Sequence, residues 1–292
     1  MECNTGLIDL HIHSTASDGS LSPEQLLQLA VNTGLSAIAI TDHDTVAGAD
    51  AALRHGIPDS LEFITGIEIS AAFPSEFNQN GSMHLLGYGI RTDHPELNRL
   101  LEKQQAARVE RNPQIIEKLK AFGIPVTMDA VIAETGKEEI GRPHIADYLV
   151  RYGYAESIDD AFDRLLGKGK PAYVDKFRVD PGEAIALIRS AGGVSVLAHP
   201  CLYQQEIGGA ISELIGSLEL LGLGGIEAYY PGHTPDQTAS LEQMAHRFGL
   251  LVTGGTDFHG DINPDIAMGT GRGNFHVPPD VFPKLKNALS GQ

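Results

Sequence analysis

Short apolar runs alternate with helical patterns along most of the chain. Several stretches between the runs begin with proline and end in glycine, as helices commonly do; examples are residues 23–34, 181–193 and 235–249. Strands that alternate with helices predict βα units and a parallel sheet. The runs of strand length, several of them nearly continuous as in strands buried on both faces, are residues 7–13, 36–43, 61–70, 83–90, 193–200, 224–230 and 250–259.

The segment between the fourth and fifth predicted strands has a different pattern. Residues 95–175 contain no strand-like run and show helical periodicity instead. Pro113 is expected to break or kink the first long helix of this segment. We therefore expect an α/β barrel made of residues 1–94 and 176–292, a closing helix within 278–292, and a helical insertion over 95–175. The helices predicted in the insertion cover residues 95–112, 113–123, 128–136, 141–153 and 157–167.

The charge balance narrows the function classes. The 292 residues include 21 Lys+Arg and 38 Asp+Glu, which gives a net charge of −17. Such a chain is not expected to hold nucleic acid through a broad basic surface. A phosphorylated substrate is still compatible, because a bound metal ion can supply positive charge locally.

Other features of the composition indicate a cytoplasmic protein. Its two cysteines, Cys3 and Cys201, provide neither a disulfide framework nor a thiolate metal cage. No apolar run approaches the roughly 20 residues of a membrane span, and no targeting signal opens the sequence. We expect no membrane association and infer no protein partner.

Histidine and acidic residues follow the predicted strands. His11 and His13 end the first strand and point to the same side, where two imidazoles can hold one metal ion; two surface histidines are the alternative. After the second strand, His43 follows Asp42, and that carboxylate can instead serve as a cap. Glu68 lies between two isoleucines of the third strand and therefore needs a partner.

The later strands carry the same signal. His84 lies near the start of the fourth strand and His199 ends the fifth, while Asp257 and His259 end the seventh. In a βα barrel the carboxyl ends of the strands form the active site, so these side chains are expected to converge. Nitrogen and oxygen donors suit Zn²⁺, Mn²⁺ or Fe ions better than soft copper sites. The sequence predicts one metal cluster.

The order of these motifs resembles the PHP (polymerase and histidinol phosphatase) family. The resemblance covers residues 7–259 apart from the insertion. It implies a distorted (β/α)7 barrel of the amidohydrolase-like type with two or three divalent metal ions, manganese being favoured over zinc or iron. The motifs are His11-x-His13, Ser17-Asp18-Gly19, Thr41-Asp42-His43, Gly66-Ile67-Glu68, His84, Ala198-His199-Pro200 and Gly255-Thr256-Asp257-Phe258-His259.

The family pattern also implies a division of the ligands among the ions. A second metal would share Glu68 with the first and add His84 and His199. His43 and His259 are in addition candidate general acids, since imidazole titrates near neutral pH. The first metal would take His11, His13, Glu68 and Asp257, and a third metal, or the substrate phosphate, would meet Asp18, His43 and His259.

Within the family, the chain length and the segments at 141–150 and 167–174 most resemble the branch that acts on nucleoside 3′,5′-bisphosphates. The resemblance implies removal of the 3′-phosphate by attack of a hydroxide that bridges two metals. A 5′-to-3′ exoribonuclease acting on short oligoribonucleotides is an alternative, as is another phosphomonoesterase such as a histidinol phosphatase. A non-catalytic domain, as in polymerase-associated copies of the fold, is disfavoured by the complete ligand set.

A bisphosphate needs a second phosphate site, which we expect in the insertion over the active site. Arg142 opens a predicted helix, where backbone N–H groups favour anions, and its fork matches a phosphate. Alternatives are a role for Ser14 in the turn after His13 and a solvated charged face for Lys103, Arg108 and Arg111. Core packing is expected for Tyr229, Tyr230 and Cys201; the alternatives are packing of a nucleobase by the two tyrosines and a metal-ligand role for Cys201. The candidate substrate contacts are Arg142, His144, Lys168, Lys170, Lys103, Ser14 and Asp18.

Overall fold

The computed structural model of the protein describes residues 6–77, 79, 81–136, 140–175, 177–205 and 207–291. The chain forms two compact units, a larger one from Met1–Arg99 with Arg178–Gln292 and a smaller one from Leu100–Phe177. The smaller unit has nearly the limits expected for the insertion. Its placement over the active site stays a prediction.

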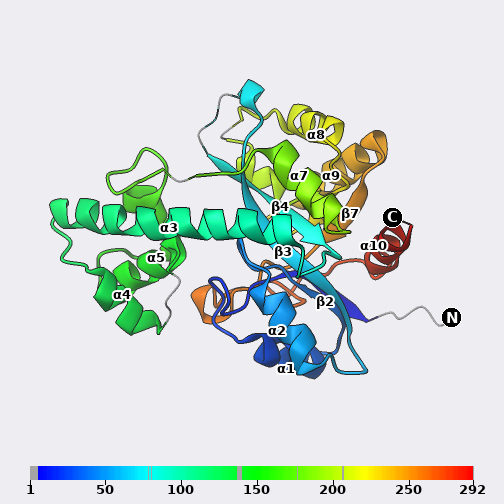
Figure 1. Cartoon of the computed structure of the whole chain (residues 1–292), viewed down its shortest axis with the longest axis horizontal. Coiled ribbons are helices and arrows are strands. Elements are labelled where there is room, and N and C mark those ends of the chain that lie inside the picture. Colours follow the sequence, from blue (N-terminus) through cyan, green and yellow to red (C-terminus); the bar gives the residue numbers. More distant parts are fainter. Residues whose placement is uncertain are drawn as a thin grey trace. The chain divides into compact units, whose positions relative to one another are not determined.

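The larger unit is built on one seven-stranded sheet whose strands follow each other in chain order (Figure 1). The two ends of this order meet: Ile12 forms a parallel bridge with Phe258, and the His13 N–H donates to the Phe258 carbonyl at 2.9 Å. This closure confirms the predicted distorted α/β barrel. The strands are β1 (Leu7–Ile12), β2 (Leu35–Ile40), β3 (Glu62–Ala72), β4 (Ser82–Tyr88), β5 (Val194–Leu197), β6 (Gly225–Tyr229) and β7 (Leu251–Gly254).

One strand departs from the predicted parallel arrangement. β4 runs antiparallel to both β3 and β5, while the other neighbouring pairs are parallel. Residues 73–81, which join β3 to β4, are too few for the crossover helix that a parallel pair requires. The reversal brings the start of β4 to the end of the barrel where β3 finishes, and His84 therefore lies opposite Ser70.

Three helices of the larger unit begin at a capping side chain. Ser22 and Thr234 form capping boxes, and the Asp180 side chain accepts from two backbone N–H groups of the first turn. The three helices predicted after these residues are confirmed. The helices of this unit are α1 (Pro23–Asn32), α2 (Ala47–His55), α7 (Pro181–Ser190), α8 (Ile211–Leu220), α9 (Pro235–Phe248) and α10 (Val281–Ser290), with short 3-10 turns at Ser75–Phe77, Pro200–Tyr203 and Gly260–Ile262.

Two apolar clusters support the strands that carry the polar residues. One packs Ile12, Ile38 and Ile40 against Leu26 and Leu27 of α1. The other packs strand residues against the closing helix α10; its members include Ile8, Leu10, Leu86, Val196, Phe282 and Leu285. Burial on this scale fixes the register of the strands, since a slip of one residue would move every side chain to the opposite face.

The smaller unit is helical and has its own apolar cluster, which includes Ile116, Val131 and Leu149. No strand occurs among its described residues, as predicted. The expected break at Pro113 is wrong, because one helix continues through it. Proline lacks only the backbone N–H, which at residue 113 would donate to the carbonyl of Val109. Val109 is 67% exposed, so this turn of the helix is accessible to water. The helices are α3 (Pro95–Ala121), α4 (Met128–Thr135), α5 (Arg142–Arg151) and α6 (Ile158–Ala161), which leads into a helical turn at Phe162–Leu166.

Among the described residues, no helix combines the length and the apolar character that would let it cross a bilayer.

Candidate metal centre

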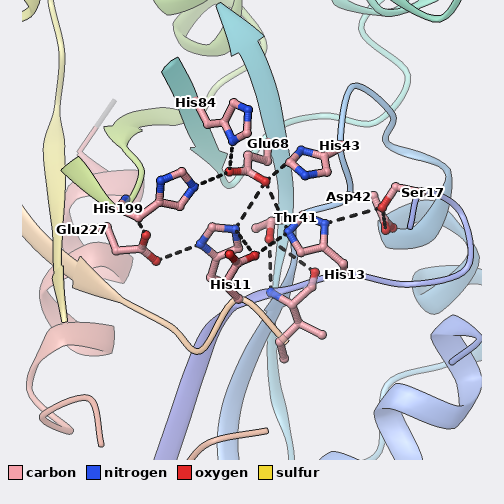
Figure 2. A network of polar contacts seen from close by, with 12 residues as sticks. His11, His13, Ser17, Thr41, Asp42, His43, Glu68, His84, His199 and Glu227 are labelled. Carbon is pink, nitrogen blue, oxygen red and sulfur yellow. Dashed lines mark hydrogen bonds and ion pairs between the residues drawn. The ribbon is translucent and has the colours of Figure 1, made fainter. Parts of the chain in front are cut away.

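Glu68 lies at the centre of the converging side chains (Figure 2). Its Oε1 is 2.9 Å from Nδ1 of His84 and 3.1 Å from Nε2 of His199. Its Oε2 is 2.9 Å from Nδ1 of His43 and 3.2 Å from Nε2 of His13. The structure thus brings together side chains from β3, β4 and the segments that follow β1, β2 and β5.

Three groups of residues could each hold one ion, because their ligand atoms lie within 4.8 Å of one another. The first, which we call the inner group, contains the four residues predicted for the first metal. In it, Asp257 Oδ1 is 3.3 Å from His11 Nε2 and 3.1 Å from His13 Nε2. The inner group is His11, His13, Glu68 and Asp257.

The second group, called the outer group, contains the residues predicted for the third metal together with His13. Asp18 is its hub: Oδ1 lies 3.3 Å from His259 Nε2, and Oδ2 lies 3.8 Å from His43 Nε2. The side chains of His43 and His259 are 16% and 14% exposed, so both face the open side of the centre. The outer group is His13, Asp18, His43 and His259.

The third group, called the bridging group, differs from the predicted second-metal set. It consists of His43, Glu68 and His84. His199 contacts Glu68, and its ring centroid lies 5.3 Å from that of His84, yet it belongs to none of the three groups found among the described residues. Glu68 is again the shared carboxylate, and its Oε1 contacts both His84 and His199. Binding of the second metal by Glu68, His84 and His199 stays a prediction.

The residues present fit divalent cations. Five buried side-chain atoms of the centre have no hydrogen-bond partner, although they lie close to one another. Buried polar atoms are ordinarily paired, because an unpaired one costs free energy. Nitrogen and oxygen atoms gathered in this way are the ligands that Zn²⁺, Mn²⁺ and Fe ions prefer. The unpaired atoms are His11 Nε2, His13 Nε2, Asp18 Oδ1, His43 Nδ1 and Glu68 Oε2.

The acidic groups of the centre stay ionised despite burial. Burial would raise the pKa of Glu68, but the imidazoles of His43, His84 and His11 hold it well below its usual range. The pKa of Asp257 is also held well below its usual range, because His11 and His259 outweigh the effect of burial. Ionised carboxylates are the form that coordinates metal.

The surroundings shift the pKa values of two imidazoles of the centre in opposite directions. Burial would lower the pKa of His13, but the neighbouring carboxylates of Asp257 and Glu68 raise it to about 10. Burial dominates at His84 and lowers its pKa to about 4 despite the neighbouring Glu68. Without metal, protons on imidazoles such as His13 therefore balance the buried carboxylates, and a cation must displace them to bind.

Backbone strain is concentrated at the centre. Among the described residues other than glycine, positive φ occurs at Asp44 (52°), His199 (29°) and Asp257 (56°). The last two are predicted ligands, and Asp44 pairs with the strand that carries Glu68, since its N–H donates to the Glu68 carbonyl at 2.9 Å. Strained residues persist where the surrounding structure holds them, commonly at functional sites.

Two buried acids that sequence reasoning did not single out support the ligands. Asp9 in β1 accepts from the Thr256 N–H at 2.9 Å, from the Thr256 hydroxyl at 2.5 Å and from the Gly269 N–H at 2.8 Å. Glu227 in β6 contacts His11 and His199. Both acids lie inside apolar strand runs, which is the same signal that identified Glu68.

The structure places Ser14 in the turn rather than toward a ligand. Its hydroxyl donates to Asp42 Oδ2 at 2.7 Å and accepts from the Ala16 N–H at 3.0 Å. Its own N–H donates to Asp42 Oδ1 at 2.7 Å. These contacts agree with the alternative in which Ser14 shapes the turn after His13, and they give Asp42 a structural role.

Tyr230 was expected to pack in the core, and it instead contacts the centre. Its hydroxyl donates to Asp257 Oδ2 at 3.4 Å, and its ring centroid lies 5.4 Å from that of His199. Its position at the end of a strand is the signal that could have identified it. Cys201, expected to be a small buried side chain, is only partly buried.

The candidate substrate residues of the smaller unit have local contacts. Arg142 begins α5, donates to the Leu166 carbonyl at 3.4 Å, and lies 5.5 Å from the ring centroid of Phe162. His144 is buried, and its Nδ1 accepts from the Gly141 N–H at 2.9 Å, which caps the helix. Substrate binding by Arg142 and His144 stays a prediction.

The remaining basic candidates lie on the surface of this unit. Lys168 and Lys170 are exposed, and the exposed Lys103 places Nζ 3.8 Å from the ring centroid of Phe177. The predicted solvated face is wrong for Arg111, which is buried and donates to Asn112 Oδ1 at 3.0 Å. A helix face of alternating charge does not reveal from sequence which cation turns inward.

Comparisons with known proteins agree with this centre. Residues 9–116 match the family model described as the PHP domain. A 5′-3′ exoribonuclease of Haemophilus influenzae is 38% identical over 251 residues, covering 86% of this chain and 89% of the relative. A 3′,5′-nucleoside bisphosphate phosphatase of Chromobacterium violaceum is 34% identical over 258 residues, covering 86% and 87%.

A solved structure extends the similarity to the fold. A protein of Bifidobacterium adolescentis, named as a metal-dependent phosphoesterase, superimposes with a TM-score of 0.84 at 32% identity, covering 98% of each chain. The match therefore includes both the barrel strands and the helical insertion. With the motifs, the fold and relatives that match most of its length in agreement, the chain belongs to the PHP family of metal-dependent phosphoesterases.

Proposed function

We propose that the protein is a phosphatase that removes the 3′-phosphate of nucleoside 3′,5′-bisphosphates and yields the 5′-monophosphate and phosphate. The observation that carries this proposal is the convergence of the inner and bridging groups on one shared carboxylate, Glu68. Two ions held by a common ligand form the clamp that in-line displacement at phosphorus uses. The bisphosphatase of C. violaceum supports the choice of substrate.

In this proposal the inner group holds one divalent ion, and Glu68 with His84 and His199 holds a second, with manganese favoured. The outer group holds a third ion or meets the substrate phosphate through Asp18, His43 and His259. Divalent ions in such sites make bound water more acidic and neutralise charge on phosphoryl oxygens. The contribution of the protein is to fix the ligand positions, which the burial of His11, His13 and Glu68 achieves.

We assign proton transfer to His43 and His259, two partly exposed imidazoles of the outer group. His43 Nε2 and His259 Nε2 both face Asp18, at 3.8 Å and 3.3 Å from its carboxylate oxygens. A protonated imidazole in this position can donate a proton to the leaving alkoxide. Replacing either histidine should lower turnover far more than it lowers occupancy of the inner group.

The second phosphate of the substrate needs a cation away from the metals. Arg142, at the N-terminus of α5, combines a bidentate guanidinium with the anion-favouring end of a helix. Lys168, Lys170 and Lys103 are further candidates in the same unit. A nucleotide is thus the proposed partner, and short oligoribonucleotides are the extended case.

A second candidate function has specific support. The 38% identical relative from H. influenzae is named a 5′-3′ exoribonuclease, which acts on a phosphodiester instead of a phosphomonoester. The same metal centre can serve both reactions, since each is a displacement at phosphorus. What would differ is the group that occupies the leaving position.

A turnover comparison in Mn²⁺ tests these alternatives. The substrates are adenosine 3′,5′-bisphosphate, the 3′- and 5′-monophosphates, and a 5′-phosphorylated dinucleotide. The proposal predicts that kcat/KM is at least about tenfold higher for the bisphosphate than for either monophosphate, because a second charge-assisted contact contributes about 1.5–3 kcal/mol. Equal values for all monoesters, or a clear preference for the dinucleotide, would contradict it.

A further inference from the structure

Glu227 is a buried carboxylate that joins two residues of the metal centre. It lies in β6 and is 0% exposed. Its Oε1 is 2.9 Å from Nδ1 of His11, and its Oε2 accepts from the backbone N–H of His199 at 2.8 Å. Figure 2 shows the carboxylate between these two histidines, on the opposite side of them from Glu68.

The contact with His11 determines which ring nitrogen faces the centre. When Glu227 Oε1 accepts a hydrogen bond from Nδ1–H of His11, the lone pair of the neutral ring lies on Nε2. That Nε2 lies 3.3 Å from Asp257 Oδ1 and 3.4 Å from Glu68 Oε2, and it has no hydrogen bond. Glu227 thus selects the tautomer of His11 that can bind a cation.

The contact with His199 holds a strained backbone. His199 has φ 29° and ψ 55°, an uncommon conformation for a residue other than glycine. Pairing of Leu197 with Ile226 brings the end of β5 beside Glu227, whose Oε2 then anchors the amide of His199. In this conformation His199 Nε2 is 3.1 Å from Glu68 Oε1.

We propose that Glu227 is a positioning residue that orients His11 and His199 around Glu68 and thereby sets the affinity of the centre for divalent cations. The inference rests on the proposed function only in requiring that the centre binds metal. Glutamine has nearly the same shape but a single acceptor oxygen. Glu227→Gln therefore loses the bond to the His199 N–H or moves the His11 proton to Nε2.

Calorimetric titration with Mn²⁺ and with Zn²⁺ tests the proposal on the full chain. Glu227→Gln should raise the Kd for the tightest ion about 10- to 100-fold, as is typical for residues that orient metal ligands. The matched control is Glu242→Gln, an exposed residue of α9 that contacts Tyr229 of the same strand and should keep the wild-type Kd. Unchanged affinity in Glu227→Gln would overturn this inference alone, whereas a wild-type protein that binds neither ion would overturn the proposed function as well.

A second readout needs no variant. In zinc-loaded wild-type protein, ¹⁵N NMR of labelled histidine should show the His11 proton on Nδ1. A proton on Nε2 would overturn the proposal even if Glu227→Gln failed to fold. A role in folding alone would lower the unfolding temperature of Glu227→Gln while leaving its ion affinity and the His11 tautomer as in the wild type, which would also overturn it.

Discussion

Glu68 is contacted by histidines from four parts of the barrel, and it belongs to both the inner and the bridging group. A side chain shared in this way cannot be replaced by a neighbour. Its side chain is also buried, between Ile67 and Ile69 in the sequence. The dependence of the centre on one carboxylate leads to a direct prediction.

Glu68→Gln keeps the shape of the side chain and removes its charge. We expect Mn²⁺ affinity to fall by more than about 100-fold, since even residues that only orient ligands cost 10- to 100-fold. Glu62→Gln, at the exposed start of the same strand and paired with Lys286, is the control and should bind normally. Metal titration that finds equal affinities for the two variants would disprove the shared-ligand role.

The protonation of His13 predicts how metal-free protein responds to pH. Its pKa is about 10 in the folded protein, against an ordinary value of 6.5. The proton therefore stabilises the fold fully below about pH 6.5, and this contribution is lost as pH rises toward 10. In urea titrations of chelator-treated protein, the unfolding free energy should fall across this range.

Two comparisons make the pH prediction specific. His13→Gln should show a shallower decline than the wild type, whereas His55→Gln, an exposed histidine in the last turn of α2, should keep the wild-type slope. Manganese-loaded protein should also decline less, because an ion replaces the proton. An identical slope in His13→Gln and wild type would refute the assignment.

At the scale of elements, the junction between β1 and the end of β7 holds the inner group together. Gly255 directly follows β7 and packs closely against β1. A Cβ at this position would lie 2.3 Å from His11 Cβ and 2.3 Å from the His11 backbone nitrogen. The next two residues also contact β1: the Thr256 N–H donates to Asp9, and Asp257 Oδ1 lies 3.3 Å from His11 Nε2. Glycine is required here by close approach and not by φ.

Gly255→Ala should therefore destabilise the protein by about 1–3 kcal/mol or more, as overpacking of a closely packed position does, and should weaken Mn²⁺ binding. Gly216→Ala in α8 is the control, because its Cβ would meet the Phe248 ring at an ordinary 3.4 Å and alanine favours a helix. Chemical unfolding and metal titration of both variants give the answer. Wild-type stability in Gly255→Ala would mean that this junction is looser than the structure shows.

The elements were predictable from sequence wherever local patterning determines them. Apolar runs located all seven strands, and Pro23, Pro181 and Pro235 marked helix starts. The direction of β4 was not predictable, because periodicity is the same for parallel and antiparallel strands. The continuation of α3 through Pro113 also escaped prediction, since tertiary packing can offset the loss of one hydrogen bond.

The candidate site likewise has features that local sequence patterning predicts and features that depend on the tertiary fold. Strand-end histidines and Glu68 could be predicted, because a charged residue in an apolar run needs a partner. Which partner it finds depends on register between distant strands, so the contacts of Glu227 and the position of His43 beside Glu68 needed the fold. Arg142 and His144 were both predicted substrate contacts, and only the structure showed that His144 caps its helix.

At the scale of the whole molecule, the two units have separate tasks in the proposed function. The barrel supplies the metal ligands, and the smaller unit, Leu100–Phe177, supplies the basic residues. A net charge of −17 makes binding of a polyanion by the surface as a whole unfavourable, so phosphate recognition must rest on metals and a few placed cations.

Arg142→Ala tests this division of labour. We expect KM for a nucleoside bisphosphate to rise at least about tenfold, because a charge-assisted contact contributes about 1.5–3 kcal/mol, while Mn²⁺ affinity stays unchanged. The control is Arg164→Ala, an exposed residue of the same unit that pairs with Asp160. If both variants keep the wild-type KM, the second phosphate is bound elsewhere.

The central claim is that His11, His13, Glu68 and Asp257 surround a divalent cation, and anomalous diffraction at the manganese edge from crystals soaked in Mn²⁺ tests it most directly. The account predicts one strong anomalous peak within the inner group and a second beside Glu68, toward His84. Peaks confined to surface carboxylates, or none at all in crystals whose Glu68 remains ordered, would contradict it.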